Sequence, residues 1–413
     1  MTMAAPIFVG GLDIGSTKTC AVLGEWVADA PTPTVKVLGV GQSRVSGVRR
    51  DAFHNLEETA ESIRQALREA ELMAGVQVRA LFTGVAAEHA ETVTSSGVVA
   101  VSGDEIDERD VERVHEVARA VVVPQDRELL HALPQDYTVD HQGGVQDPVG
   151  MLGTRLETHL VLVSANAAAT RNLRRAVERA GYEVAQLVLA PLASGLAVLA
   201  PEEREIGVAL VEIGGRTSEV TVFADGRLRH VGVVPVGGVH VTQDVARGLG
   251  LPYADAERLK ERYGVALAQL VDPSEMLEVP GPGPGQRRAV CREWLAHIIE
   301  SRVDEILRLA LDEVERAGWL RRLGAGAVLT GGGASLDGTA AIAEAVFGLP
   351  VRAGCPGPGL VGLADSVARP KFATAAGLAL FGAQRWVERS QNGRRLVPAA
   401  WARRLGTWLR EFF

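Results

Sequence analysis

Leu12-Asp13-Ile14-Gly15-Ser16, near the start of the chain, and Val211-Glu212-Ile213-Gly214-Gly215, in its second half, are the two stretches that decide the fold. Each places a carboxylate at the end of an apolar run and follows it with an Ile-Gly turn. A unit that recurs along a chain indicates a repeated architecture. We therefore expect two similar α/β domains that face each other.

The sequence around both stretches predicts a sheet. IFVGGLDIG, TCAVLGE and VKVLGVGQS are rich in Val, Leu and Ile and are separated by turn residues, which is typical of consecutive strands. A helix over 55–74, with apolar residues at helical spacing, and the strand QVRALFTGV follow. The second half starts again with three strands within GVALVEIGGRTSEVTVFADGRLRHVGVV. The two halves thus begin with the same order of elements.

The first half contains an inserted domain. From residue 86 the sequence changes to SSGVVAVSGDEIDERDVERVHEVARA and then to polar loops that contain proline. The α/β pattern resumes at His159 with HLVLVSANAAAT, a helix over 171–180, the strand EVAQLVLA and a helix from Pro191. The insertion therefore lies inside the first domain.

The second half contains a second, mainly helical, insertion. Helices are expected over 239–263 and 288–317, and the loop VPGPGPGQRR between them cannot hold regular structure because Pro and Gly alternate in it. AVLTGGGASLDG and a helix over 370–387 then return to the second domain. We expect the first domain at 1–85 and 164–199, its insertion at 86–163, the second domain at 200–235 and 325–388, its insertion at 236–324, a linker at 389–397 and a terminal helix at 398–413.

Composition excludes several classes of protein. The chain has 413 residues and a net charge of -8, with 47% hydrophobic and 23% charged residues, which is typical of globular proteins of two or more domains. Three distant cysteines build neither a disulfide framework nor a CxxC metal site. The first twelve residues lack the basic region of a secretory signal, and no apolar run is long enough to span a membrane. The acidic balance argues against a nucleic-acid partner.

The two quoted turns are candidates for phosphate binding. Gly11 and Gly15 permit close approach of the backbone, Ser16 and Thr17 offer hydroxyl groups, and Lys18 can reach a phosphate oxygen. Asp13 would order water bound to Mg2+. One such segment could be a plain β-turn. Two copies, one in each domain, favour a clamp that holds the phosphates of one nucleotide from both sides.

Two further segments add to this site. LTGGGASLDG, 329–338, places three glycines between a strand and a helix, where backbone can lie against a base and sugar, although such turns often use glycine without a ligand. Glu257 and Lys260 lie one helical turn apart, as a surface ion pair or as groups that bind a nucleoside. Lys371, one of only four lysines, is expected to start a helix near the domain hinge, with no chemistry assigned.

Other familiar signals are absent or accidental. No Gly-Lys dipeptide occurs, so a P-loop is excluded. Gly357, Gly359 and Gly362 match GxGxxG, but Pro356 and Pro358 indicate a loop and no dinucleotide-binding unit surrounds them. No zinc-ligand pattern is present.

The last sixteen residues predict an amphipathic helix. Aromatic residues and leucines fall on one helical face, and from Arg394 onward five arginines stand against one acidic residue, Glu411. A basic, aromatic helix suits an anionic membrane surface, although the same face could dock on the protein's own core. The residues expected to bind the membrane are Trp401, Arg403, Arg404, Leu405, Trp408, Leu409, Arg410, Phe412 and Phe413.

The paired turns and LTGGGASLDG are similar to those of the actin/Hsp70/sugar-kinase superfamily, which implies duplicated ribonuclease-H-type domains around a nucleotide cleft. QDPVGMLGTRLE, GGVHVTQDVARGLGLPYADAERLKERYG and PKFATAAGLALFG narrow this, because they resemble motifs of the bacterial cell-division actin homologue family FtsA over 8–387. In that family's terms the four expected parts are subdomains 1A, 1C, 2A and 2B.

The resemblance implies a peripheral protein on the cytoplasmic face of the cell membrane at the division site. It implies bound ATP and Mg2+, actin-like filaments made of copies of the chain, and tethering of the tubulin-like protein FtsZ, whose C-terminal peptide would dock on subdomain 2B, together with other division proteins. Asp13 and Glu212 would be catalytic and Asp13 would serve the metal. The nucleotide would contact Gly11, Asp13, Gly15, Ser16, Thr17, Lys18, Gly214, Gly215, Arg216, Thr217, Gly238, Glu257, Lys260, Gly331, Gly332, Gly333 and Ser335.

This chain departs from the family pattern at two positions. Glu212 stands where the family usually has Asp, and Arg216 where it usually has Gly. The carboxylate therefore reaches about one methylene further, and a guanidinium occupies space near the phosphates. We expect nucleotide binding with slow turnover. A pilus-assembly protein of the same fold is the first alternative, and the amphipathic tail speaks against it. A small-molecule kinase is the second, and no motif for its base or acceptor pocket is found.

Overall fold

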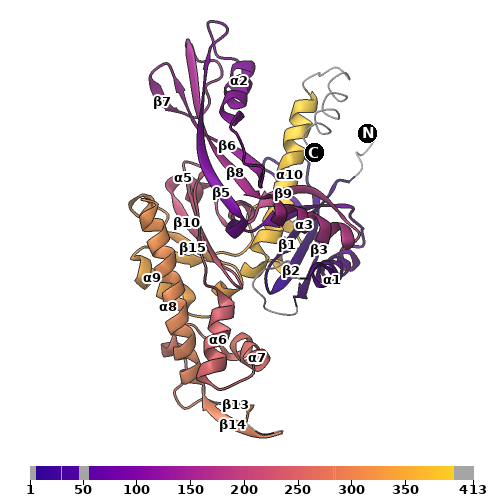
Figure 1. Cartoon of the computed structure of the whole chain (residues 1–413), viewed down its shortest axis with the longest axis vertical. Helices are drawn as coiled ribbons and strands as arrows, with labels where there is room; N and C mark the ends of the chain where they lie inside the picture. Colours follow the sequence, from indigo (N-terminus) through magenta and orange to yellow (C-terminus); the bar gives the residue numbers. More distant parts are fainter. Residues whose placement is uncertain (1–5, 29, 46–54, 282, 284, 395–413) are drawn as a thin grey trace.

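Each quoted turn ends the first strand of a sheet in the computed structural model, which describes residues 6–28, 30–45, 55–281, 283 and 285–394. In Figure 1 the first sheet lies right of centre and the second lies left of it. The first sheet has the order β17 (Leu360–Gly362), β3 (Val35–Arg44), β2 (Lys18–Trp26), β1 (Phe8–Ile14), β4 (Ala80–Val85) and β9 (Glu183–Leu189). The second has the order β12 (Arg227–Val234), β11 (Ser218–Ala224), β10 (Val208–Ile213), β15 (Ala327–Thr330) and β16 (Val351–Ala353).

The repeat expected from the sequence is a repeat of topology. Strand β1 pairs antiparallel with β2 and parallel with β4, and β10 pairs antiparallel with β11 and parallel with β15. Parallel neighbours end at the same edge of a sheet, so each acidic strand end lies beside the end of a second strand. The edges that carry the two turns can therefore form one site.

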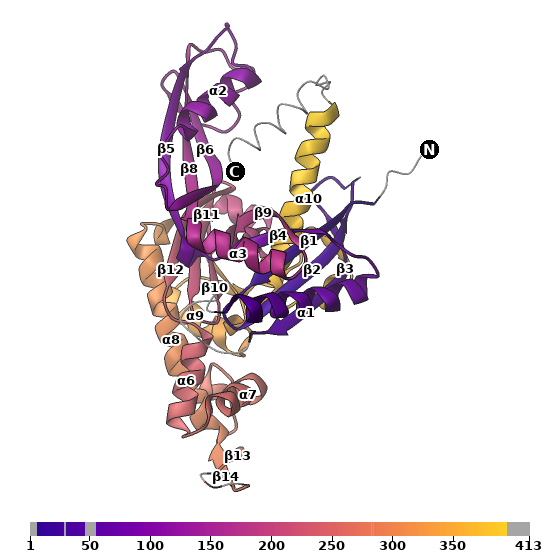
Figure 2. The same cartoon turned by 45° about the vertical axis from the view of Figure 1, so that its right-hand side comes forward.

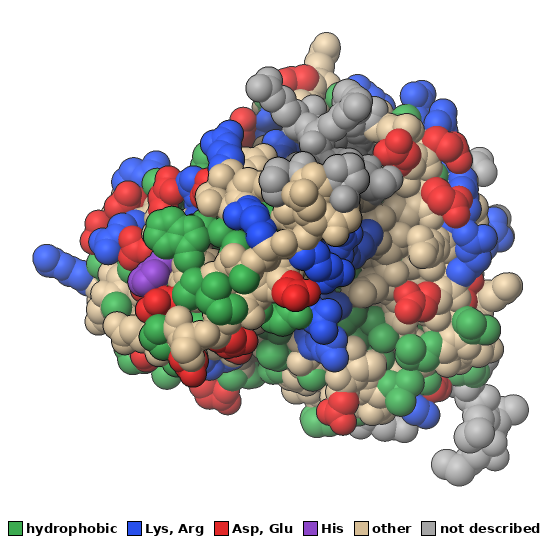
Figure 3. Space-filling model, turned by 90° about the horizontal axis from the view of Figure 1, so that it is seen from below, with side chains coloured by type: hydrophobic (Ala, Val, Ile, Leu, Met, Phe, Trp, Pro, Cys, Tyr) green, Lys and Arg blue, Asp and Glu red, His purple; other side chains and the backbone are tan. Residues whose placement is uncertain are grey.

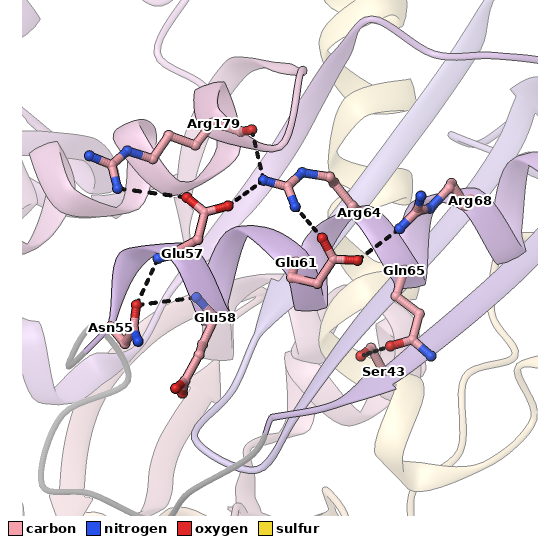
Figure 4. Close-up of polar contacts among 9 residues, drawn as sticks. All are labelled: Ser43, Asn55, Glu57, Glu58, Glu61, Arg64, Gln65, Arg68 and Arg179. Carbon is pink, nitrogen blue, oxygen red and sulfur yellow. Dashed lines mark hydrogen bonds and ion pairs between the residues drawn. The ribbon is translucent and has the colours of Figure 1, made fainter.

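Helix α1 (Leu56–Ala74) covers the first sheet, as the sequence predicts. The Asn55 side chain caps it by accepting from the backbone nitrogens of the first turn (Figure 4). Gln65 accepts from the Ser43 hydroxyl at 2.9 Å, which ties the helix to β3. Its outer face carries ion pairs among Glu57, Glu61, Arg64, Arg68 and Arg179.

The first insertion is a four-stranded sheet that rises from the top of the molecule (Figures 1 and 2). It comprises η1 (Ala87–His89), β5 (Ala90–Ala100), α2 (Glu108–Arg119), β6 (Arg127–Val139), β7 (Gln142–Val145) and β8 (Arg155–Asn166), with the strand order β5-β8-β6-β7. The return to the α/β pattern expected at His159 comes later, because β8 stays paired with β5 as far as Ala165. Asn166 then caps α3 (Ala167–Arg179), which starts four residues before the expected Arg171.

The second insertion hangs below the second sheet (Figures 1 and 2). It comprises α6 (Gly238–Gly248), α7 (Tyr253–Tyr263), η2 (Ala268–Leu270), β13 (Met276–Pro280), β14 (Arg287–Cys291) and α8 (Arg292–Arg316). The prediction that VPGPGPGQRR holds no regular structure is wrong at both ends, where β13 and β14 pair antiparallel. The expected helix start at Arg288 is wrong for the same reason, and α8 begins at Arg292.

Helix α10 (Ala373–Arg394) lies between the two sheets and packs on β1 and α4 (Ala190–Val198). It continues through the first six residues expected as a linker, so that the linker prediction is wrong over 389–394. The remaining short elements are α5 (Pro201–Ile206), α9 (Thr339–Phe347), η3 (Leu320–Arg322), η4 (Gly333–Ser335), η5 (Ala364–Ser366) and η6 (Pro370–Phe372). No helix of the described residues combines the length and apolar character needed to cross a membrane.

Gly11 of β1 is needed for this close packing. A Cβ atom at this position would lie 2.1 Å from the Ala375 carbonyl oxygen and 2.7 Å from the Ala379 nitrogen of α10. These are backbone atoms of a buried helix, so they cannot yield without moving the helix. Gly11 therefore lets α10 approach the sheet and is covered by it.

Gly11→Ala should lower the free energy of unfolding by roughly 1 to 3 kcal/mol, because the added methyl group overpacks the contact between β1 and α10. Urea denaturation followed by circular dichroism measures this loss. Gly103→Ala is the matched control, since a Cβ there would meet its nearest atom at 3.9 Å. Equal stability of the Gly11 variant and the natural chain would contradict the packing role.

Candidate functional site

A cavity of about 380 Å³ opens between the two sheets where the two turns meet. Its size is within the usual range for small-molecule sites. One of the residues expected to bind a nucleotide, Gly11, does not line the cavity, because α10 covers it. The expectation for Gly11 is therefore wrong. The cavity is lined by all the others: Asp13, Gly15, Ser16, Thr17, Lys18, Glu212, Gly214, Gly215, Arg216, Thr217, Gly238, Glu257, Lys260, Gly331, Gly332, Gly333 and Ser335.

The two turns have the same construction and touch each other. Gly15 N donates to Lys18 O at 2.9 Å, and Gly214 N donates to Thr217 O at 3.0 Å. A Cβ atom at Gly215 would lie 2.7 Å from Ser16 Oγ and 2.9 Å from Thr17 Oγ1. A side chain at Gly215 would therefore displace the hydroxyl groups of the first turn from their present positions. Backbone N–H groups and hydroxyl groups from both halves converge there, as in anion sites.

Lys18 points toward the third glycine segment. Its Nζ donates to the Lys371 carbonyl oxygen at 3.0 Å, and a Cβ atom at Gly332 would lie 3.5 Å from it. Gly331 has a φ of +84°, in the left-handed region that favours glycine, and Ile213 backbone fills the space where a Cβ would stand. The ammonium group thus lies among the first turn, η6 and the glycine loop.

Three carboxyl groups meet beneath the turns. Glu212 and Glu219 are register partners across the β10–β11 pair, and Asp13 is the last residue but one of β1. Burial raises the pKa of Asp13 to about 7, with repulsion from Glu212 adding to the rise and Lys18 opposing it. Burial, and then repulsion from Glu212, raise the pKa of Glu219 to about 8. The pKa of Glu212 is also raised by burial, while a hydrogen bond from Thr374 opposes the rise.

This carboxyl cluster suits a divalent cation that takes some of its ligands from the protein and the others from water and a bound phosphate group. Glu212 Oε1 accepts from Thr374 Oγ1 at 2.8 Å, whereas Glu212 Oε2 is buried and has no hydrogen-bond partner. Within 6–394, less the gaps given above, no three His, Cys, Asp or Glu side chains are arranged to hold a metal by themselves. Mg2+ typically keeps several waters and takes one or two carboxylates together with phosphate oxygens, and these residues fit that mode.

Glu257 and Lys260 form an enclosed polar group rather than the surface ion pair considered above. Lys260 Nζ donates to Glu257 Oε2 and Thr242 Oγ1 at 2.8 Å and to Gly238 O at 3.2 Å. The Lys260 side chain is 12% exposed, and the pair lines the cavity. Fixed donors and acceptors of this kind can bind ribose hydroxyls and a base edge.

The structure adds cavity residues that the sequence did not single out. Among them are Glu88, His89, Glu219 and Thr374. One signal could have found Glu219, since it is an acidic residue inside the otherwise buried strand β11. Lys371, to which no chemistry was assigned, lines the cavity, and its Nζ donates to Gln42 Oε1 at 2.6 Å. Seen from below, Lys and Arg side chains gather in the middle of the molecule's face (Figure 3).

Comparison with known proteins assigns the chain to a family. The model of the family described as cell division protein FtsA matches residues 209–377, and that of the SHS2 domain inserted in FtsA matches 87–164. Cell division protein FtsA of Pseudomonas aeruginosa is 40% identical over 91% of this chain and 89% of that protein. The chain belongs to the FtsA family of cell division proteins. FtsA of Escherichia coli K12 is 37% identical over 98% of both chains.

Solved structures bear on the fold of this FtsA-family chain. The PilM-PilN type IV pilus biogenesis complex contains a chain with a TM-score of 0.62 at 18% identity, covering 91% of this chain and 98% of that one. MreB5 of Spiroplasma citri bound to ADP has a TM-score of 0.52 at 12% identity, covering 93% and 98%. The expected actin-like fold with an FtsA-type insertion is confirmed. The tail residues expected to bind a membrane lie outside the described residues.

The carboxyl cluster predicts that the free protein loses stability as pH rises. Asp13 and Glu219 have raised pKa values in the folded state, so between pH 5 and 9 the folded state binds more protons than the unfolded state. The free energy of unfolding therefore falls across this range. Glu219→Gln keeps an acceptor oxygen for Ala87 N but cannot ionise, so it should remove roughly 2 kcal/mol or more of the fall.

Urea unfolding at several pH values, without nucleotide or Mg2+, measures this effect. Glu58→Gln on α1 is the control, because its side chain is exposed and points away from the polar contacts around it (Figure 4). Parallel stability curves for the Glu219 variant and the natural chain would contradict the prediction.

Proposed function

We propose that this FtsA-family chain binds Mg-ATP between its two sheets, assembles into actin-like filaments on the inner face of the cell membrane, and tethers FtsZ there through a C-terminal amphipathic helix. The observation that carries the nucleotide part is the contact between the two turns, where a side chain at Gly215 would strike Ser16 and Thr17. Hydroxyl groups and turn backbone of both halves therefore face one small space, as in phosphate sites.

Phosphate binding is supported by the groups that converge on the cavity. The turns offer backbone N–H groups and hydroxyls, and Lys18 adds a positive charge between them and the glycine loop. The structural neighbour MreB5 of Spiroplasma citri was solved with ADP and with AMPPNP. The same class of ligand would place its phosphates at the turns of this chain and its nucleoside toward Glu257 and Lys260.

The carboxyl cluster supports a role for Mg2+. Bound with the nucleotide, Mg2+ would offset the charge of the phosphates. Asp13 would hold its water ligands, and Glu212, through its unpartnered Oε2, would orient a water molecule near the terminal phosphate. Thr374 restrains Glu212 by its hydrogen bond, and Arg216 adds a guanidinium group to the cavity wall. Turnover would be slow, which suits a filament that persists while ATP is bound.

Membrane attachment is supported by the sequence of the tail. Trp401, Trp408 and Phe412 would share one helical face with leucines, while arginines flank it. One short helix binds a membrane weakly, but many tails on one filament bind tightly. Family membership favours this role over the pilus-assembly alternative, because the relatives at 36–40% identity are cell division proteins.

Lys18→Ala should raise the Kd for Mg-ATP roughly tenfold to hundredfold, since it removes a charged hydrogen bond of about 1.5 to 3 kcal/mol. Titration with a fluorescent ATP analogue measures the Kd. Lys36→Ala is the matched control, because Lys36 is an exposed lysine of the same sheet and lies outside the cavity. Unchanged affinity in the Lys18 variant would count against phosphate binding at this turn.

Sedimentation with phosphatidylglycerol vesicles tests the membrane part. The whole chain should pellet, and more of it should pellet with Mg-ATP, whereas a chain ending at Arg394, which leaves α10 whole, should stay in the supernatant. Leu405→Glu in the whole chain should also stay in the supernatant, because it places a charge on the apolar face.

The two variants separate tail binding from misfolding. Equal pelleting of the whole chain and the shortened chain, or no pelleting of either, would overturn tethering by the tail. Recruitment of purified FtsZ to the same vesicles, by the whole chain alone, is the expected second result.

A further inference from the structure

Glu219 is an acidic residue in the interior of β11. All seven residues of this strand are buried, and Glu219 is 7% exposed. Burying a carboxyl group is costly unless the group is paired. Glu212, its register partner on β10, is acidic too, and like charges opposite each other destabilise a sheet. A residue held in this place at such a cost is expected to have a function.

Glu219 holds the root of the first insertion. Its Oε1 accepts from the backbone nitrogen of Ala87 at 2.6 Å. Ala87 is buried and begins η1, the turn that joins β4 of the first sheet to β5 of the inserted sheet. A strand of the second half thus fixes the point from which the inserted sheet rises.

The same turn forms part of the cavity wall. Glu88 and His89 of η1 line the cavity, as does Glu219 itself. A ligand in the cavity would therefore lie against η1 and against the side chain of Glu219, which holds η1 through Ala87. Strand β5 follows η1 directly, and its first residues pair with the end of β8.

We propose that Glu219 and η1 couple the occupant of the cavity to the inserted domain, so that bound Mg-ATP tightens the attachment of that domain to the rest of the molecule. The inference rests on the proposed binding of Mg-ATP. Glu219 lines the cavity together with Asp13 and Glu212. A cation bound there attracts all three carboxyl groups, and this attraction holds Glu219 in the position from which it accepts from Ala87. Glu219 is a positioning residue in this role.

Hydrogen–deuterium exchange of the whole chain tests the coupling. Amides over 87–94 should exchange about five to ten times more slowly with saturating Mg-ATP than with Mg2+ alone. In Glu219→Gln this difference should shrink to less than twofold, because the amide accepts from Ala87 but does not respond to the cation. Each variant is measured at an ATP concentration that saturates it, as established by its own titration.

Glu128→Gln is the control for a merely structural effect. Glu128 on β6 accepts from both terminal nitrogens of Arg174 on α3, so it also holds the inserted sheet, but neither residue lines the cavity. This variant should speed exchange over 87–94 with and without ATP by the same factor, and so keep the ATP-dependent difference.

Each outcome decides between the proposals. If the natural chain is saturated with Mg-ATP and exchange over 87–94 does not change, the coupling is overturned while nucleotide binding stands. A full ATP-dependent difference in Glu219→Gln would assign the coupling to another residue and overturn this one. A natural chain that never saturates would overturn the proposed nucleotide binding, and the coupling with it.

Discussion

The contact between the two turns is the constraint on which the rest of the site depends. Gly215 lies against Ser16 and Thr17 and so joins the two halves at the cavity. Any movement of one sheet relative to the other would break this contact and change the shape of the cavity. Asp13, Glu212 and Glu219 line the same cavity, and burial raises the pKa of all three, while repulsion from Glu212 raises those of Asp13 and Glu219 further. Burial thus disfavours the charged carboxylates at the place where a cation and phosphates would fit. A bound cation would offset this cost and hold the halves together.

Both insertions reach the same cavity from opposite ends of the molecule. The upper insertion contributes η1, and the lower one contributes Gly238, Glu257 and Lys260. Arg44 of β3 forms an ion pair with Glu261 of α7, so the lower insertion is also tied to the first sheet beside the cavity. Residues from all four parts of the molecule therefore line one cavity, although the insertions themselves lie far from each other (Figure 1).

Much of the site could be predicted from the sequence because its residues belong to a repeated motif. A strand end followed by Ile-Gly has few conformations, and two copies of it imply a common ligand. Gly11 is on the same strand face as Asp13, but it lies two residues earlier, which is about 7 Å along the strand. At that distance from the cavity α10 covers the sheet. Periodicity along the chain does not show which distant segments will pack together. The sequence therefore did not predict that α10 covers Gly11, that β13 pairs with β14, or how far β8 extends. Thr374 was missed, and Lys371 was assigned no chemistry, because their position at the cavity depends on where α10 crosses β1.

Helix α10 gives the molecule a stiff axis. It begins at the cavity, where Thr374 binds Glu212, and it runs without interruption to Arg394, a span of about 30 Å. A helix packed along its first half against the first sheet and α4 behaves as a lever, so a small tilt at its base displaces its far end by a larger distance. The position of Arg394 is therefore set by the geometry at the cavity.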